Sequence, residues 1–165
     1  MSGGYMNRFL WVDLTAGTLR EEAPSADLLQ AFIGGYGVGA RVLYSHVTRH
    51  TKPLESGNVL GFLTGPLTGT PAPTGTRWTV VGKSPLTGPW GDANGSGYFG
   101  VAFKQAGYDA VFFSGISTQP VYLYTSGTNA ARVSAGHGVD AGRGGAKAHG
   151  TRSAGLGGRC QGSLG

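Results

Sequence analysis

Cysteine is almost absent from this sequence: Cys160 stands alone among 165 residues. A single cysteine excludes a disulfide framework within the chain and a metal site made of four cysteines. Long apolar runs are also missing, because the longest stretches reach only a few residues, far short of the roughly 20 that a membrane-spanning helix needs. The first residues have neither the basic nor the apolar region of a secretory signal. We therefore expect a cytoplasmic protein that does not enter a membrane.

Acidic residues are few, and the charge balance changes along the chain. Thirteen basic and eight acidic residues give a net charge of +5. Residues 1–125 hold eight basic and seven acidic side chains, a balance of +1, whereas residues 126–165 hold five basic and one acidic, a balance of +4. The first part has no basic face, so we expect it not to bind nucleic acid.

Glycine, in contrast, is abundant, with 32 residues and no triplet period, which excludes collagen. Residues 126–165 contain twelve glycines, no aromatic residue and no apolar period. Such a segment cannot bury enough apolar area to offset the entropy of ordering it. We therefore divide the chain into a domain over residues 1–125 and a tail over residues 126–165. The tail is interpreted as disordered or as translated out of frame, and the abrupt change in composition favours the second interpretation.

Apolar patterns and turn signals in the first part predict strands mixed with a few helices. The expected strands lie at residues 6–14, 18–22, 58–63, 78–81, 110–113 and 120–124, and the expected helices follow the N-cap candidate Ser25 or span residues 38–46 and 98–107. The first two strands form a hairpin around a turn at Gly17. Because strands and helices do not alternate steadily, we predict an α+β fold and not a doubly wound sheet.

Two long loops rich in proline and glycine, at residues 64–77 and 84–97, are candidate binding regions. Long ordered loops tend to be functional. Proline fixes φ and glycine permits positive φ, so these loops can present a defined backbone surface to an anion. Arg77 ends the first loop, and its guanidinium can bind a phosphate through two hydrogen bonds. From the residue alone, a solvated surface arginine is the alternative.

The second loop carries Asn94, Gly95 and Ser96 just before the helix expected from Tyr98. The free N–H groups at the start of a helix form a natural phosphate site. An ordinary helix cap with a turn is the alternative interpretation of the same residues. Asp92 in this loop is a weaker functional candidate.

Other motifs are set aside. Gly35, Gly37 and Ala40 fit the spacing of a dinucleotide fingerprint, but they follow a helical pattern instead of a strand. His46 and His50 have no cysteine or carboxylate at ligand spacing, so no metal site is expected there. Asp109 is interpreted as a turn or cap residue, and no catalytic constellation is visible.

Several motifs in a fixed order closely resemble the aldehyde ferredoxin oxidoreductase family over residues 5–125. They lie at residues 10–14, 34–40, 58–63, 65–77, 83–88, 93–100, 106–110 and 120–124. The resemblance implies a β-rich N-terminal domain with a few short helices, incomplete at its C-terminal side. That domain is the base for a tungsten (or molybdenum) atom held by two pterins. The family oxidises aldehydes to carboxylic acids and passes electrons through a 4Fe-4S cluster to ferredoxin.

The resemblance also implies roles for single residues. Arg77 would contact the pterin cofactor, and Asn94, Gly95 and Ser96 would meet the cofactor phosphates, with Asn94 at a bridging magnesium. The cluster cysteines and acid/base residues of the family lie in later domains that this chain lacks. No catalytic residue is therefore expected here, and the chain alone should be inactive.

The expected partners are the remaining domains of the enzyme, ferredoxin and an aldehyde substrate, and a homo-oligomer is left open. Two alternatives remain at this point. The chain could be a non-enzymatic module that binds an anionic ligand or a partner surface, or a non-functional truncated gene product.

Overall fold

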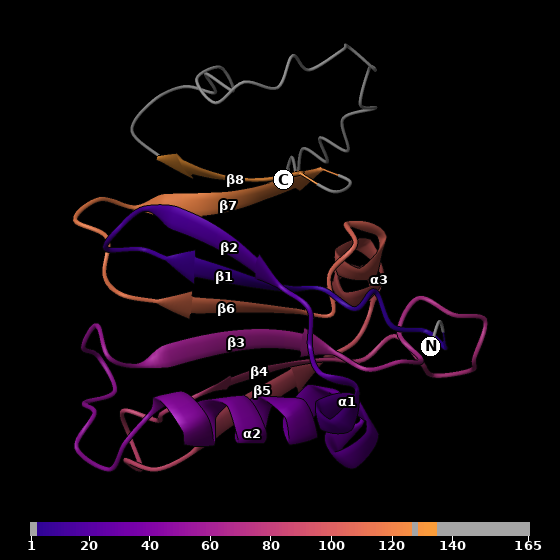
Figure 1. Cartoon of the computed structure of the whole chain (residues 1–165), viewed down its shortest axis with the longest axis horizontal. Helices are drawn as coiled ribbons and strands as arrows, with labels where there is room; N and C mark the ends of the chain where they lie inside the picture. The colour runs from indigo at the N-terminus through magenta and orange to yellow at the C-terminus, as the bar shows by residue number, and fades with distance from the viewer. Residues whose placement is uncertain (1–2, 127–128, 135–165) are drawn as a thin grey trace, which may run out of the picture.

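A mixed six-stranded sheet forms the centre of the molecule, whose computed structural model describes residues 3–126 and 129–134 (Figure 1). The strand order is β2-β1-β6-β3-β4-β5. The bounds are β1 Phe9–Asp13, β2 Thr18–Glu22, β3 Val59–Thr64, β4 Trp78–Gly82, β5 Gly91–Gly95 and β6 Ala110–Ser114. Strands β7 (Val121–Ser126) and β8 (Asn129–Ser134) form a separate hairpin. With three short helices in the described part, the expected α+β fold is confirmed.

The first hairpin forms where the alternating pattern predicts it. Strands β1 and β2 pair antiparallel from Phe9↔Glu22 to Asp13↔Thr18. The Asp13 carboxylate oxygen Oδ1 accepts hydrogen bonds from the backbone N–H groups of Thr15 and Ala16, both at 2.8 Å. An aspartate in this position stabilises a tight turn by replacing a backbone acceptor.

Strand β6 joins two parts of the sheet that are far apart in sequence. It pairs parallel with β1 and antiparallel with β3. Its residues Ala110, Val111 and Phe112 are at most 2% exposed, as expected for a strand with neighbours on both sides and layers on both faces. The short apolar run in the sequence therefore marks the most buried strand.

Helices α1 (Ala26–Phe32) and α2 (Gly35–His46) cover one face of the sheet (Figure 1). The Ser25 hydroxyl oxygen accepts from the Leu28 N–H at 3.1 Å, which confirms the expected N-cap. The core on this face comes from both helices and four strands: Phe9, Leu29, Val38, Val42, Leu43, Val59, Leu63, Val81, Ala110 and Phe112. Each large side chain buried there contributes about 1.5–3 kcal/mol.

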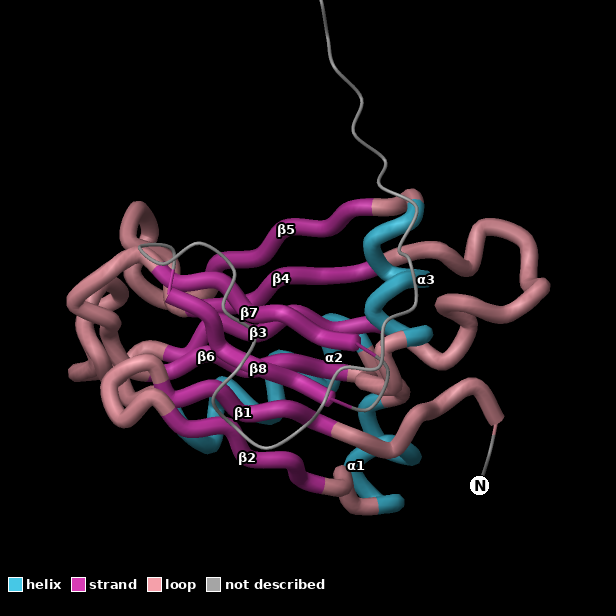
Figure 2. Tube along the Cα trace, turned by 90° about the horizontal axis from the view of Figure 1, so that it is seen from above, coloured by secondary structure: helices cyan, strands magenta, loops and turns pink. Residues whose placement is uncertain are grey.

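Helix α3 (Tyr98–Gln105) and the β7–β8 hairpin lie on the opposite face (Figure 2). Leu10, Val12 and Val111 form the sheet side of this second core, and Leu123 of β7 packs against it. Seen from above, β4 and β5 extend beyond the hairpin. This face is therefore covered over β1 and β6 and more open towards β5.

Two strands were not expected from the sequence. Strand β5 lies inside the second loop and has no β-branched residue, so only its pairing with β4 holds it extended. Strand β8 lies at residues that were assigned to the tail. Residues 135–165, which make up most of that tail, lie outside the described residues.

No helix in the described ranges is long and apolar enough to cross a membrane.

Candidate functional site

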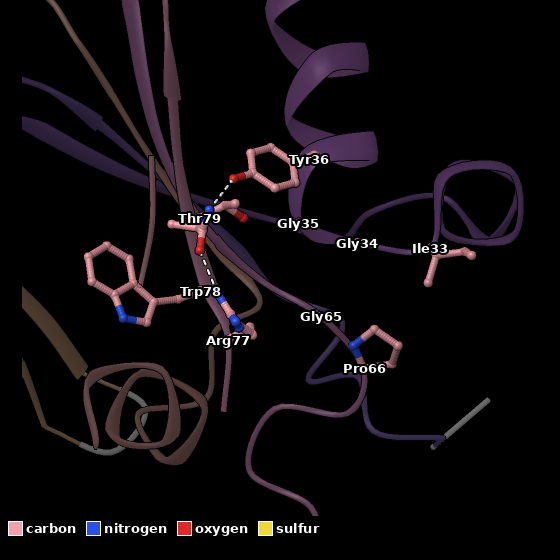
Figure 3. A pocket seen from close by; sticks show the side chains of 10 residues that line it. Ile33, Gly34, Gly35, Tyr36, Gly65, Pro66, Arg77, Trp78 and Thr79 are labelled. Carbon is pink, nitrogen blue, oxygen red and sulfur yellow. Dashed lines mark hydrogen bonds between the residues drawn. The ribbon is translucent and has the colours of Figure 1, made fainter. Parts of the chain in front are cut away.

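A pocket of about 440 Å³ opens where the amino end of α2 meets the start of the first loop and the strands β4 and β5 (Figure 3). It is lined by Ile33, Gly34, Gly35, Tyr36, Gly65, Pro66, Arg77, Trp78, Thr79 and Asn94. These residues come from segments that are distant in the sequence, and the sheet register brings them together.

Arg77 and Asn94, both expected at a binding site, converge in this pocket. Strand β4 begins one residue after Arg77, and its pairing with β5 places Thr79 opposite Asn94. The Arg77 guanidinium donates to the Asn94 amide oxygen Oδ1 at 2.6 Å. The two glycine-rich loops therefore share one concave surface.

The sequence analysis missed Tyr36. The Asn94 amide nitrogen Nδ2 donates to the Tyr36 hydroxyl oxygen at 2.9 Å, so Arg77, Asn94 and Tyr36 form one continuous chain of hydrogen bonds. Figure 3 shows Tyr36 and Arg77 directed towards the same space from a helix and from a strand end. The glycine-rich segment around Tyr36 was noted as a poor dinucleotide fingerprint and as part of the family resemblance, but no role was assigned to Tyr36 itself.

The amino end of α2 points at the pocket and has no side-chain cap. Its N-cap residue is Gly34, and no side chain bonds its first N–H groups. The Gly37 N–H donates to the Gly34 carbonyl oxygen at 3.1 Å, whereas the N–H groups of Gly35 and Tyr36 precede the first hydrogen bond of the helix and carry partial positive charge. Gly37 permits the close junction with α1, because a Cβ atom there would lie 2.4 Å from the Phe32 carbonyl oxygen.

Gly95 and Ser96 do not line the pocket. Successive residues of a strand face opposite sides of a sheet, so Gly95 lies on the face away from Asn94. A Cβ atom on Gly95 would lie 2.7 Å from the Trp78 indole ring. Ser96 is exposed between β5 and α3. Of the three residues expected at the start of α3, only Asn94 lines this pocket, which opens at the start of α2.

A buried ion pair supports the wall of the pocket. Lys104 and Asp109 are 3% and 4% exposed and contact each other directly. The Lys104 ammonium also donates to the Gly4 carbonyl oxygen at 2.7 Å. A Cβ atom on Gly4 would meet the Pro66 carbonyl oxygen, so the N-terminal segment lies directly against the start of the first loop.

Asp109 is more than the turn or cap residue that was expected. Its carboxylate accepts from the N–H groups of Met6 and Asn7, at 3.1 and 2.7 Å. Its carbonyl oxygen accepts from the N–H of Thr64, the last residue of β3 and the first of the first loop, at 2.9 Å. Asp109, itself 4% exposed, therefore ties the N-terminal segment to the end of β3, where the first loop begins.

Charge in the pocket is of one sign. Among the residues that the structure describes, no carboxylate lines it and Arg77 is the only ionic side chain in its lining. Asp92 lies in the same strand as Asn94 but accepts from the Trp90 indole N–H at 2.6 Å and does not line the pocket. Among the described residues, no group of three or more histidine, cysteine or acidic side chains could hold a metal ion. The geometry therefore suits an anion.

Comparison with protein families gives a match over most of the chain. A model described as the N-terminal domain of aldehyde ferredoxin oxidoreductase matches residues 9–148. Similar curated proteins include a tungsten-containing aldehyde ferredoxin oxidoreductase of Pyrococcus abyssi, 44% identical over 126 residues, which are 76% of this chain and 21% of the relative. The protein of the same description from Pyrococcus horikoshii is 42% identical over 126 residues, again 76% of this chain and 21% of the relative.

A solved structure shares the fold. It is the active site complex BamBC of benzoyl coenzyme A reductase with 1,5-dienoyl-CoA, with a TM-score of 0.79 and 32% identity. The alignment covers 81% of this chain and 20% of that one. The chain thus spans about a fifth of the length of the curated relatives that it matches.

Proposed function

This chain belongs to the aldehyde ferredoxin oxidoreductase family, and we propose that it is the cofactor-binding base of a tungsten-dependent aldehyde:ferredoxin oxidoreductase. The whole enzyme would oxidise an aldehyde to a carboxylic acid and pass the electrons to ferredoxin. Because the chain spans about a fifth of its curated relatives, we propose that it acts only together with the remaining domains and is inactive alone. The cytoplasmic location expected from the sequence is part of this proposal.

The observation that carries the proposal is the pocket between α2, the first loop and β5. Its Arg77 guanidinium, its uncapped helix start and its lack of carboxylates suit the phosphate of a pterin cofactor. When bound, the tungsten and its pterin dithiolenes supply the redox chemistry of aldehyde oxidation. The residues of this chain would contribute binding and orientation.

We propose that Arg77 and Asn94 hold the cofactor phosphate. Gly95 and Ser96 remain proposed contacts because they directly follow Asn94, although neither lines the pocket. The magnesium proposed at Asn94 fits less well. The Asn94 amide oxygen accepts from the Arg77 guanidinium at 2.6 Å, so a cation on its second lone pair would lie close to the positive charge of Arg77. The ligands of the 4Fe-4S cluster would come from the remaining domains.

Removing the Arg77 guanidinium tests the proposal. We expect that Arg77→Ala, produced together with the remaining domains of the enzyme, lowers the pterin and tungsten content of the purified protein by about tenfold or more, because a charge-assisted hydrogen bond contributes about 1.5–3 kcal/mol. Pterin fluorescence after extraction and elemental analysis for tungsten measure the loss without requiring activity.

Arg49→Ala is the matched control, because it removes the same charge from an exposed residue outside the pocket. The control should retain both tungsten and pterin. Equal cofactor content in the Arg77 and Arg49 variants would contradict the proposed phosphate site.

A further inference from the structure

The direction of each hydrogen bond in the Arg77–Asn94–Tyr36 chain follows from the chemistry of its members. A guanidinium can only donate, so the Asn94 amide oxygen must face Arg77, as it does at 2.6 Å. The Asn94 amide nitrogen, which can only donate, must then face Tyr36, at 2.9 Å. The orientation of the amide is therefore fixed by Arg77 and is not an arbitrary choice between oxygen and nitrogen.

The hydroxyl group of Tyr36 therefore uses its capacity to accept a hydrogen bond, but not its capacity to donate one. Its oxygen accepts from Asn94, and a phenol still has one hydrogen to donate. No acceptor for that hydrogen is found within the part of the chain that the structure describes. Tyr36 is 40% exposed, and Figure 3 shows its hydroxyl on the Arg77 side of α2. The unused hydrogen is therefore available to a ligand in the pocket.

We propose that Tyr36 is a further ligand-binding residue that donates this hydrogen to the phosphate oxygens of a phosphate monoester bound by Arg77. The inference rests on the proposed function, since it assigns a second contact in the same pocket. Three kinds of group then face the ligand, and all of them donate: the remaining guanidinium N–H groups, the Tyr36 hydroxyl and the first N–H groups of α2. A site made of donors selects a fully deprotonated oxyanion, which offers only acceptors.

Asn94 acts in this arrangement as a positioning residue. By donating to Tyr36 and accepting from Arg77, it holds both donors in the pocket and fixes which way the Tyr36 hydrogen can point. Tyr36 adds a hydrogen bond but no charge, whereas Arg77 adds both. The two residues should therefore differ in how their loss changes the salt dependence of binding, because salt screens charge interactions at exposed sites.

The test is a titration of the 165-residue chain with methyl phosphate, followed through the backbone amides of Gly35 and Tyr36 and the side-chain amide of Asn94 by NMR. We expect saturable binding to the unaltered chain and binding weaker by about tenfold or more to Tyr36→Phe, because the variant loses a hydrogen bond to a charged group. Its salt dependence should stay unchanged. Arg77→Met should weaken binding and also reduce the salt dependence.

Tyr44→Phe is the matched control, since Tyr44 lies on the same helix and is 85% exposed. It should bind methyl phosphate like the unaltered chain. A dispersed amide spectrum for each variant shows that the fold is intact. For the unaltered chain, affinity should rise with pH through the second pKa of a phosphate monoester, about 6, while binding of sulfate should not change.

The outcomes separate the two proposals. If Arg77→Met loses binding while Tyr36→Phe binds like Tyr44→Phe, the role of Tyr36 is wrong and the proposed phosphate site stands. If the unaltered, folded chain does not bind methyl phosphate, both are wrong. If only Tyr36→Phe loses binding, Tyr36 is a ligand-binding residue and the role assigned to Arg77 is wrong.

Discussion

Tyr108 shows how one residue makes the stability of this chain depend on pH. Its side chain is fully buried, and its hydroxyl donates to the Glu21 carboxylate at 2.7 Å. Arg8 donates to the same carboxylate oxygen at 2.5 Å and lies over the Tyr108 ring. Burial, and next the hydrogen bond to Glu21, raise the pKa of Tyr108 to about 12. Hydrogen bonds from Arg8 and then Tyr108 lower the pKa of Glu21.

The raised pKa of Tyr108 predicts a loss of stability in alkali. In the unfolded chain the phenol titrates near pH 10, so below that pH the neutral form contributes its full stabilisation. As the pH rises from about 10 to about 12, the unfolded chain loses the proton first and the free energy of unfolding falls. The expected loss is about 2–3 kcal/mol.

Tyr108→Phe tests this effect, because it keeps the buried ring and removes the titrating group. Urea unfolding between about pH 9 and pH 12, the range in which tyrosine titrates, should show a smaller alkaline loss of stability in the variant. Equal alkaline slopes in the two proteins would show that Tyr108 does not cause the effect.

At the scale of single elements, the junction of α1 and α2 determines the shape of the pocket. Gly37 lies in the first turn of α2, where alanine would normally gain about 1 kcal/mol through helix propensity. A Cβ atom at this position would, however, lie 2.4 Å from the Phe32 carbonyl oxygen. A backbone atom cannot move aside without shifting α1, so the clash should outweigh the propensity.

We therefore expect Gly37→Ala to lower the free energy of unfolding by about 1–3 kcal/mol, as overpacking usually does, and to weaken methyl phosphate binding. Gly57→Ala is the control, because its Cβ atom would make only an ordinary 3.4 Å contact with the Thr51 methyl group. A Gly37 variant as stable as the Gly57 variant would mean that the junction adjusts without cost.

Most elements could be predicted from local patterns, and the failures have a common cause. The β1–β2 hairpin, the Ser25 cap and the buried run of β6 are encoded by neighbouring residues. The local sequence of β5 does not predict a strand, because Gly-Asp-Ala-Asn-Gly is typical of a turn. Only pairing with β4, which depends on tertiary structure, keeps it extended.

Some residues of the candidate site could likewise be predicted from the local sequence, and others depend on tertiary structure. Arg77 and Asn94 could be found from residue type and loop composition, and the structure brings them together. Tyr36 could not be found, because its role depends on where the start of α2 lies relative to β5. Gly95 and Ser96 were grouped with Asn94 by sequence proximity, although strand alternation turns Gly95 to the other face.

At the scale of the whole molecule, β5 is an edge strand with little protection. The opposite edge, β2, carries Arg20, Glu21 and Glu22, whereas β5 has one charged residue, Asp92. Charged residues on an edge prevent pairing with another chain. Nearby, Leu60 and Phe99 are 44% and 48% exposed. We expect the isolated chain to self-associate through the β5 edge.

Ala93→Lys should suppress this association, because it places a charge in the middle of the β5 edge at an exposed position. Sedimentation velocity over a range of protein concentrations measures the effect. Thr118→Lys adds the same charge in an exposed loop and serves as control. If both variants associate like the unaltered chain, the contact does not involve β5.

The place of β6 between β1 and β3 has a consequence during synthesis on the ribosome. The hairpin of residues 9–22 and the antiparallel strands β3–β4–β5 are each made early, but neither borders the other in the finished sheet. They can be joined only after residues 110–114 have left the exit tunnel, because those residues pair with both. Pairing between segments that are distant in sequence slows folding. Until this pairing forms, the apolar surfaces of β1 and β3 stay exposed. The nascent chain should therefore depend on chaperones until β6 emerges.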